Sequence, residues 1–520
     1  MNRKEYLIEL IEGLSKTEKR YFVLFASVHS KDSNYIKLFE ALSKEKKYNE
    51  PVFKKKYSKA SFIKHFRYNK HHLYQLILKS LQNYHSKASV NHEIKDILKS
   101  VAILYAKELY SHCWKLLVKA KKLAGKSENY IALLDVFDWE LELSRMEGNP
   151  YVLKEKSEDT AIQRKKILLN LSENYKMDTY IETMMVQTRM QGKNRSKQVN
   201  KSAKLIINNL LSEKTLNIDI RNKFISRRTR SLYYFYTGNY KRGYELEQEI
   251  YNLQNAHPIK INEIPKRYII TLHNLTQAAL LLMNYKVFLN HMEELRKVIL
   301  RFSSSDYTPS IRMFFKLEYL FYVKTGLFYQ GVKRANRLEQ ELNSYHYKEG
   351  SWWVLEIYYY IGYCYFGMKD YKTALHWFFK ILNDENISRF PPLHYYTVML
   401  HTLTRYELSD IKLLPSVLRS TQDFLEKRKR SYKLETCLLK YLRKISNWGY
   451  AINEVKLMNW YIQLHNELIE IIKDPFEKRA MEYFDFISWL ESKIYKKPFV
   501  EIIREKAALT PEVIKMSEIH

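Results

Sequence analysis

An aromatic residue recurs in this chain at nearly constant intervals, each time at a predicted boundary between two helices. The recurring positions are Tyr240, Tyr285, Phe328 and Tyr371, which follow one another at intervals of 45, 43 and 43 residues. Three residues after these markers stand Gly243, Phe288, Gly331 and Ala374. Nine residues before them stand Ser231, Thr276, Tyr319 and Gly362. Since both columns are mostly small, they predict helical hairpins whose two helices approach closely and which stack along the chain.

The clearest unit is LEIYYYIGYCYFGMKDYKTALHWFFKILND, residues 355–384. It resembles one tetratricopeptide (TPR) unit, whose pattern of aromatic, aliphatic and small residues falls on Tyr358, Ile361, Gly362, Tyr365, Ala374 and Phe378. The resemblance extends more loosely over residues 92–475. It implies an all-α fold, a right-handed TPR-like superhelical solenoid of helical hairpins. The interval exceeds the 34 residues of a standard unit, which predicts longer helices or loops.

Composition favours the same fold class. Only 12 Gly and 11 Pro occur in 520 residues, well below the usual ~7% and ~5%, so long helices are expected. We predict a basic helical N-terminal region at residues 1–90 and a TPR-like α-solenoid at 91–475. C-terminal capping helices are expected at 476–520, where a stack needs an end with a polar outer face. Gly238 and Gly326 precede two markers by two residues and predict turns with positive φ.

The charge and cysteine content restrict the environment and the partners. The net charge of +30 would attract nucleic acid, an anionic membrane or an acidic protein. The three cysteines are far apart, so neither a disulfide framework nor a paired metal motif is expected. The apolar run Ala278–Met283 is too short to cross a bilayer. The N-terminus reads as an amphipathic helix instead of a signal peptide. We therefore expect a cytoplasmic protein without a membrane span.

Motifs that would carry catalysis or hold a cofactor are not complete in the sequence. Gly125-Lys126-Ser127 matches the end of a phosphate-binding loop, but Ala120 stands where that loop needs its first glycine. His71 and His72 are neighbours, so on a helix they point to different sides and are poor joint metal ligands. We expect a non-enzymatic protein with no catalytic residues, no metal and no cofactor.

The TPR resemblance implies a peptide-binding surface. In TPR proteins the first helix of each hairpin lines the concave face, and its side chains contact a ligand. By this correspondence the candidate peptide-binding residues are Arg228, His273, Asn274, Gln277, Lys316, Lys324, Tyr359 and Tyr363. Cations spaced by one repeat with tyrosines between them would suit an acidic or C-terminal peptide segment. The alternative is that these positions form a solvated face or the packing between helices.

The N-terminal region supplies a second candidate surface. Ser15-Lys-Thr-Glu18 predicts a capping box that starts a helix. From Pro51 to Asn91 there is no acidic residue, and aromatic residues alternate with basic ones. The candidate nucleic-acid-binding residues are Lys54, Lys55, Lys56, Lys59, Lys64, Arg67 and Lys70. A basic helix here could enter a DNA groove, although the same pattern fits a helical cap with a basic outer face.

Two functional hypotheses follow from these surfaces. The first is a scaffold or adaptor that binds a protein or peptide partner, expected to be acidic, in the groove of the solenoid. The alternative is a nucleic-acid-associated regulator in which residues 1–90 contact DNA or RNA and the solenoid binds a partner. In a weaker variant, the solenoid itself provides a track for RNA. The sequence leaves the oligomeric state open.

Overall fold

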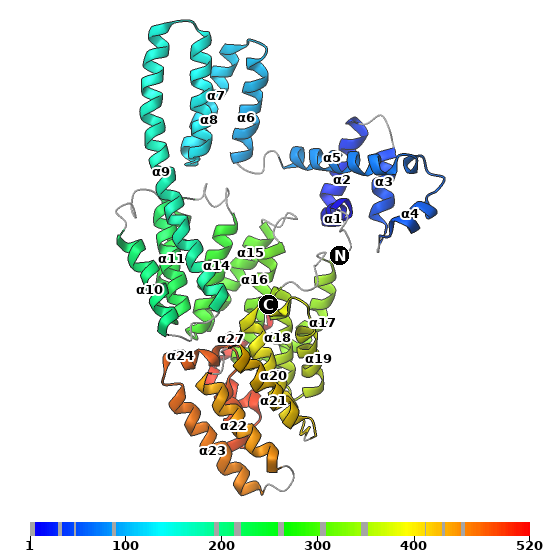
Figure 1. Cartoon of the computed structure of the whole chain (residues 1–520), viewed down its shortest axis with the longest axis vertical. Coiled ribbons are helices and arrows are strands. Elements are labelled where there is room, and N and C mark those ends of the chain that lie inside the picture. Colours follow the sequence, from blue (N-terminus) through cyan, green and yellow to red (C-terminus); the bar gives the residue numbers. More distant parts are fainter. Residues whose placement is uncertain are drawn as a thin grey trace. The chain divides into compact units, whose positions relative to one another are not determined.

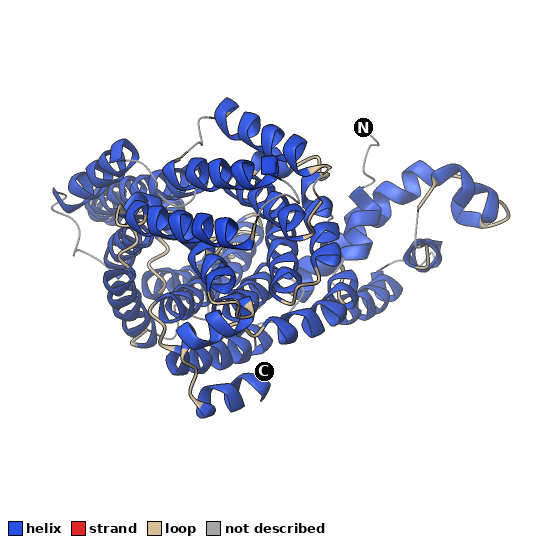
Figure 2. Cartoon of the chain, turned by 90° about the horizontal axis from the view of Figure 1, so that it is seen from below, coloured by secondary structure: helices blue, strands red, loops and turns tan. Residues whose placement is uncertain are grey.

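A computed structural model describes residues 6–519 apart from 30–33, 46–47, 86–89, 192–196, 213–219, 258–264, 302–307, 345–351, 411, 429–431 and 449–452. Within these residues every regular element is a helix and there is no strand, which confirms the all-α class (Figure 2). Contacts between residues divide the chain into two compact units. The division between them falls between Glu173 and Asn174, within one long helix.

The first unit begins with a small helical bundle. Its helices are α1 (Tyr6–Gly13), α2 (Lys16–His29), α3 (Asn34–Ser43), α4 (Glu50–Lys56) and α5 (Phe66–Tyr84) (Figure 1). The predicted capping box is present: the Glu18 amide donates to Ser15 Oγ at 3.2 Å, and the Ser15 amide donates to Glu18 Oε2 at 2.7 Å. Phe22, Leu38 and Leu73 are fully buried in the core that these helices share.

Helical hairpins follow in the same unit. Their helices are α6 (Val90–Tyr105), α7 (Tyr110–Lys126), α8 (Tyr130–Met146) and the start of α9 (Pro150–Gln191). The buried interior between α6, α7 and α8 contains Val101, Leu117 and Val136. Gly125, Lys126 and Ser127 lie at the C-terminal end of α7, and not between a strand and a helix.

The second unit continues as consecutive pairs of helices. Their bounds are α10 (Lys197–Ser212), α11 (Ile220–Thr237), α12 (Tyr240–Asn255), α14 (Pro265–Leu281), α15 (Tyr285–Arg301), α16 (Thr308–Thr325), α17 (Phe328–Ser344), α18 (Trp352–Gly367), α19 (Tyr371–Leu382), α20 (Pro391–Glu407), α21 (Leu414–Lys427), α22 (Lys433–Trp448) and α23 (Glu454–Ile471). Sequential neighbours such as α11 and α12, α18 and α19, and α20 and α21 pack together. The four marker aromatics are the first residues of α12, α15, α17 and α19.

The turns inside these hairpins share one backbone conformation. Gly238 and Gly326 have φ values of 87° and 71°, as predicted. Met283 and Lys369 occupy the same turn position with φ of 55° and 63°. The next residue then caps the following helix in several turns: the Asp370 side chain, for example, accepts a hydrogen bond from the Thr373 amide at 3.1 Å. A left-handed residue before the cap therefore recurs with the repeat.

The small residues lie where helices cross. A Cβ atom on Gly362 of α18 would lie 2.5 Å from the Phe378 ring of α19. One on Gly331 of α17 would lie 2.5 Å from Cys364 Sγ of α18. Ala374 of α19 is fully buried. The recurrence of small residues in the sequence thus reflects close helix packing, and this prediction is confirmed.

The C-terminal segment crosses several hairpins. It comprises α24 (Pro475–Lys478), the 3₁₀ helix η5 (Arg479–Glu482), α25 (Phe486–Ile494), α26 (Phe499–Ala507) and α27 (Pro511–Ile519); it is the red end of the chain in Figure 1. We expected these residues to cover one end of the stack. Instead, α25 packs against α23, and α26 packs against α16. Phe484, Phe486 and Trp489 are almost fully buried, so the segment forms part of the core of this unit.

Candidate functional site

The C-terminal segment covers part of the predicted peptide-binding surface. Tyr359 and Tyr363 of α18 are 2% and 3% exposed. The Tyr359 hydroxyl donates to the Tyr483 carbonyl oxygen at 3.1 Å, and the Asp485 amide donates to the Tyr363 hydroxyl at 3.3 Å. Lys324 reaches the same segment, its Nζ donating to a backbone carbonyl oxygen at 3.3 Å. These three side chains bind the chain's own C-terminal segment in the place where we expected a partner's peptide.

The remaining predicted peptide contacts belong mainly to a polar network between helices. Arg228 pairs with the fully buried Glu247, with 2.9 Å between Nη1 and Oε2. Asn274 donates to the Glu247 carboxylate at 3.1 Å. Lys316 forms an ion pair of 2.9 Å with Glu356. Burial, followed by the positive charge of Lys316, lowers the pKa of His273 to about 4. Arg228, Asn274 and Lys316 therefore bind neighbouring helices of the same unit.

Gln277 is half-buried on α14, one helical turn after His273. The predicted peptide-binding residues as a set therefore still bind mainly within their own unit. The interpretation as packing between helices, one of the two alternatives left open by the sequence, fits Tyr359 and Tyr363 in particular. The predicted surface is not an open groove in this structure because residues 481–485 bind across it.

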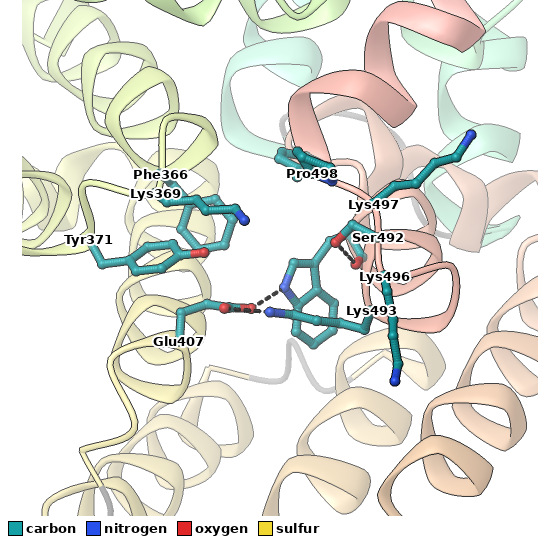
Figure 3. A pocket seen from close by; sticks show the side chains of 11 residues that line it. Phe366, Lys369, Tyr371, Glu407, Ser492, Lys493, Lys496, Lys497 and Pro498 are labelled. Atoms are coloured by element: carbon teal, nitrogen blue, oxygen red, sulfur yellow. Dashed lines mark hydrogen bonds and ion pairs between the residues drawn. The ribbon is translucent and has the colours of Figure 1, made fainter. Parts of the chain in front are cut away.

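A pocket of about 320 Å³ lies in the second unit beside this covered surface. Three separate stretches of sequence form it: the end of α18 with the start of α19, the end of α20, and α25 with the start of α26 (Figure 3). The lining residues are Phe366, Lys369, Tyr371, Glu407, Trp489, Ser492, Lys493, Lys496, Lys497, Pro498 and Phe499. We refer to it as the lysine pocket.

A buried carboxylate organises one side of the lysine pocket. Glu407, whose side chain is 6% exposed, accepts a hydrogen bond from Trp489 Nε1 and pairs with Lys493 Nζ, both at 2.6 Å (Figure 3). Burial raises the pKa of Tyr371, and the charge and hydrogen bonding of Glu407 raise it further. Glu407 thus holds α20, α25 and the start of α19 together. Because Lys493 compensates the charge of Glu407, the role of this carboxylate is to position the helices that line the pocket.

The rim of the lysine pocket carries three exposed lysines. Lys369 is exposed at the left-handed turn position between α18 and α19. The Lys496 and Lys497 side chains are 68% and 48% exposed. Their ammonium groups contact Glu454 at 2.5 Å and Glu505 at 2.9 Å. Such exposed pairs contribute little to stability.

The sequence alone does not indicate the lysine pocket. Lys369 and Lys497 are far apart in the chain, and the return of the C-terminal segment to α18 cannot be inferred from the spacing of the repeat. Two local signals were present. Lys496-Lys497-Pro498 is a basic pair before a proline, and lysine at position 369 occupies a turn position where glycine is favoured.

The predicted nucleic-acid-binding residues divide into two groups. Lys54 and Lys70 both pair with Glu50, at 2.8 and 2.6 Å, and Lys56 pairs with Glu45 at 2.6 Å. The other four are exposed: Lys55, Lys59, Lys64 and Arg67. The aromatic residues between them mostly face inward, since Phe53, Phe62 and Phe66 are buried in the core of the N-terminal bundle. The region thus combines a structural core with a basic surface.

Comparisons with known proteins found no matching family model, no similar curated protein and no similar solved structure. Among the described residues, no group of three or more His, Cys, Asp or Glu side chains could hold a metal ion. The helices of the described part include none long and apolar enough to cross a membrane.

Proposed function

We propose that this chain is a non-enzymatic scaffold or adaptor that binds an acidic segment of a protein partner. The single observation that carries the proposal is the lysine pocket, which is lined by aromatic side chains and by exposed lysines. Phe366 and Phe499 are among its apolar lining residues, and Lys369, Lys496 and Lys497 are the exposed lysines at its rim. Carboxylates of the partner would pair with the rim while an apolar side chain enters the pocket.

The size of the lysine pocket supports a peptide ligand. About 320 Å³ is at the lower end of the range typical of ligand pockets and suits one or two side chains. A peptide segment that presents an apolar residue between acidic ones matches this arrangement. The net charge of +30 would accelerate the encounter with such a segment at low ionic strength.

We further propose that the hairpins form a right-handed TPR-like stack and that the protein acts in the cytoplasm. The recurring left-handed turn before each marker aromatic supports the repeat. The close approach of Gly331 in α17 to Cys364 in α18 supports the packing of successive hairpins. The three cysteines are all buried and unpaired, which agrees with a reducing compartment.

The proposal is tested by purifying the tagged full-length chain from its native cells, with and without nuclease treatment. The pocket variant Lys369→Glu/Lys497→Glu is compared with Lys286→Glu/Lys297→Glu, which makes the same change of charge at exposed lysines of the same unit. The proposal is supported if a protein still co-purifies after nuclease treatment and if its recovered amount falls at least about tenfold in the pocket variant but not in the control. A partner retained equally by both variants, or one released by nuclease, contradicts it.

A further inference from the structure

Helix α5 of the N-terminal bundle has an exposed face made almost entirely of polar and basic side chains. The exposed residues on this face are Arg67, Tyr68, His71, Gln75, Lys79 and Gln82, whereas the exposed Asn83 and Tyr84 at the end of the helix fall outside it. At about 100° per residue these positions fall within roughly 120° of the helix circumference, and they extend for roughly 22 Å along its axis. They form one continuous stripe, which we call the α5 face.

The opposite side of α5 is anchored in the core. Phe66, Leu73, Leu76 and Ile77 are buried there, and α5 packs against α2. Both ends of the helix are also fixed. Asn69 Nδ2 donates to the Phe62 carbonyl oxygen at 2.9 Å, and the His85 ring contacts the Glu18 carboxylate at 2.8 Å. The α5 face is therefore presented on a rigid support, which favours recognition of a ligand of fixed shape.

The charge around the α5 face is positive. No acidic residue occurs between Pro51 and Asn91. The nearby Glu45 and Glu50 already pair with Lys56, and with Lys54 and Lys70, respectively. The exposed lysines that precede α5 add further positive charge: Lys55, Lys59 and Lys64. Among the described residues, no carboxylate lies within ion-pair distance of Arg67 or Lys79.

We propose that the α5 face binds double-stranded DNA with the helix lying in the major groove. The major groove admits an α-helix. Arg and Lys can contact phosphates and guanine edges, and Gln75 and Gln82 have the donors and acceptors that suit adenine. The proposal is independent of the lysine pocket.

Two other polyanionic surfaces fit the α5 face less well. An anionic membrane would favour a helix with an apolar side turned outward, but Tyr68 is the only aromatic or aliphatic residue among the six. Duplex RNA has a deep, narrow major groove that side chains do not read. A partner attracted by charge alone would not use the hydrogen-bonding groups of Gln75 and Gln82. The residue types therefore favour the DNA duplex.

The test measures binding of the full-length chain to a fluorescein-labelled 20-base-pair DNA duplex by anisotropy over a series of NaCl concentrations. We expect the variant Arg67→Glu/Lys79→Glu to lose at least about tenfold in affinity. If both side chains contact phosphates, the magnitude of the slope of the logarithm of the association constant against the logarithm of the NaCl concentration should decrease by about 2. The matched control is Lys95→Glu/Lys99→Glu, which changes the charge equally at exposed positions of α6 and should bind more tightly than the α5 variant.

A charge-neutral variant and two other ligands complete the experiment. Gln75→Ala/Gln82→Ala should retain its salt slope while losing its preference between duplexes of different sequence. Circular dichroism establishes that each variant is folded. The proposal is overturned if the α5 variant and the α6 control bind DNA equally. It is also overturned if an RNA duplex, or vesicles containing phosphatidylserine, bind the wild-type chain more tightly than DNA.

Discussion

Arg504 Nε donates a hydrogen bond to the carbonyl oxygen of Gly326 at 3.0 Å. The bond joins α26 to the turn between α16 and α17. Gly326 has a φ of 71°, and a Cβ atom added to it would lie 2.9 Å from Arg504 Cγ and 3.0 Å from the Val500 carbonyl oxygen. The C-terminal segment therefore depends on a glycine in this turn for two reasons, its backbone conformation and the space above it.

Replacing Gly326 by alanine should lower the free energy of unfolding of the second unit by about 2–4 kcal/mol. The left-handed conformation alone costs a residue with a Cβ atom about 1–2 kcal/mol. The remainder reflects displacement of α26, because the Val500 backbone cannot rotate away as a flexible side chain can. Urea unfolding followed by circular dichroism measures the change.

Gly148→Ala separates these two contributions. Gly148 has almost the same φ, 70°, but nothing lies within 4 Å of its added Cβ atom. This variant should therefore lose only about 1–2 kcal/mol in the first unit, from the backbone term alone. If Gly326→Ala lowers the free energy of unfolding by no more than Gly148→Ala does, the close packing of α26 over the turn is contradicted.

Arg479 should be among the most sensitive positions in the C-terminal segment. Its side chain is 6% exposed and pairs with Glu482 at 2.7 Å. It also donates to the Tyr240 hydroxyl at 2.8 Å and to the Phe235 carbonyl oxygen at 3.1 Å. Arg479→Ala leaves these buried groups without their cation, so we expect a loss of about 3–5 kcal/mol in unfolding free energy.

The neighbouring Lys478→Ala removes the same charge from an exposed position and should change stability by less than about 0.5 kcal/mol. Arg479→Lys should fall between the two variants, because an ammonium group cannot reproduce the planar set of donors. Equal stability of the alanine variants at 478 and 479 would contradict the buried role of Arg479.

The fold was predictable to the extent that it depends on local sequence. The marker aromatics and the residues two positions before them identify the hairpin turns, since the turn conformation and the helix start are both determined within a few residues. Gly238 and Gly326 announced this conformation, but Met283 and Lys369 adopt it without glycine. There the packing of the helices on either side outweighs the local preference.

The candidate site was not predictable because it depends on contacts between distant parts of the chain. Tyr359 looks like a ligand contact in the repeat, and only the return of Tyr483 shows that it is internal. The lysine pocket has the same origin, since Lys369 and Lys497 line one cavity from two distant segments. Repeat spacing describes neighbours along a stack, whereas a segment that crosses several hairpins follows no period.

Acidification should destabilise the second unit. Burial, followed by the charge of Lys316, lowers the pKa of His273 from its ordinary value near 6.5 to about 4. Between these values the unfolded chain binds a proton that the folded chain does not, so stability decreases as the pH falls. For this group the loss at pH 5 relative to pH 8 is roughly 2 kcal/mol.

His273→Gln removes this titration and should flatten the dependence of unfolding free energy on pH between 7 and 5. Urea unfolding at each pH provides the measurement. His376→Gln, the same substitution at an exposed position of the same unit, serves as the control. An unchanged profile in the His273 variant would mean that this histidine is protonated equally in the folded and unfolded chains.

Removing the C-terminal segment should unfold part of the second unit and not open a functional groove. A chain ending at Lys473 loses Phe484, Phe486 and Trp489, each at most 1% exposed, and uncovers Tyr363. Burying each large apolar side chain contributes about 1.5–3 kcal/mol, so the combined loss approaches the whole stability of a typical domain. The shortened chain should bind a hydrophobic dye and lose its cooperative thermal transition.

A chain ending at Ala508 removes only α27, in which Val513 is buried, and should keep that transition. If the chain ending at Lys473 also unfolded cooperatively without binding dye, the segment would be a detachable occupant and the predicted peptide surface would again be a candidate site.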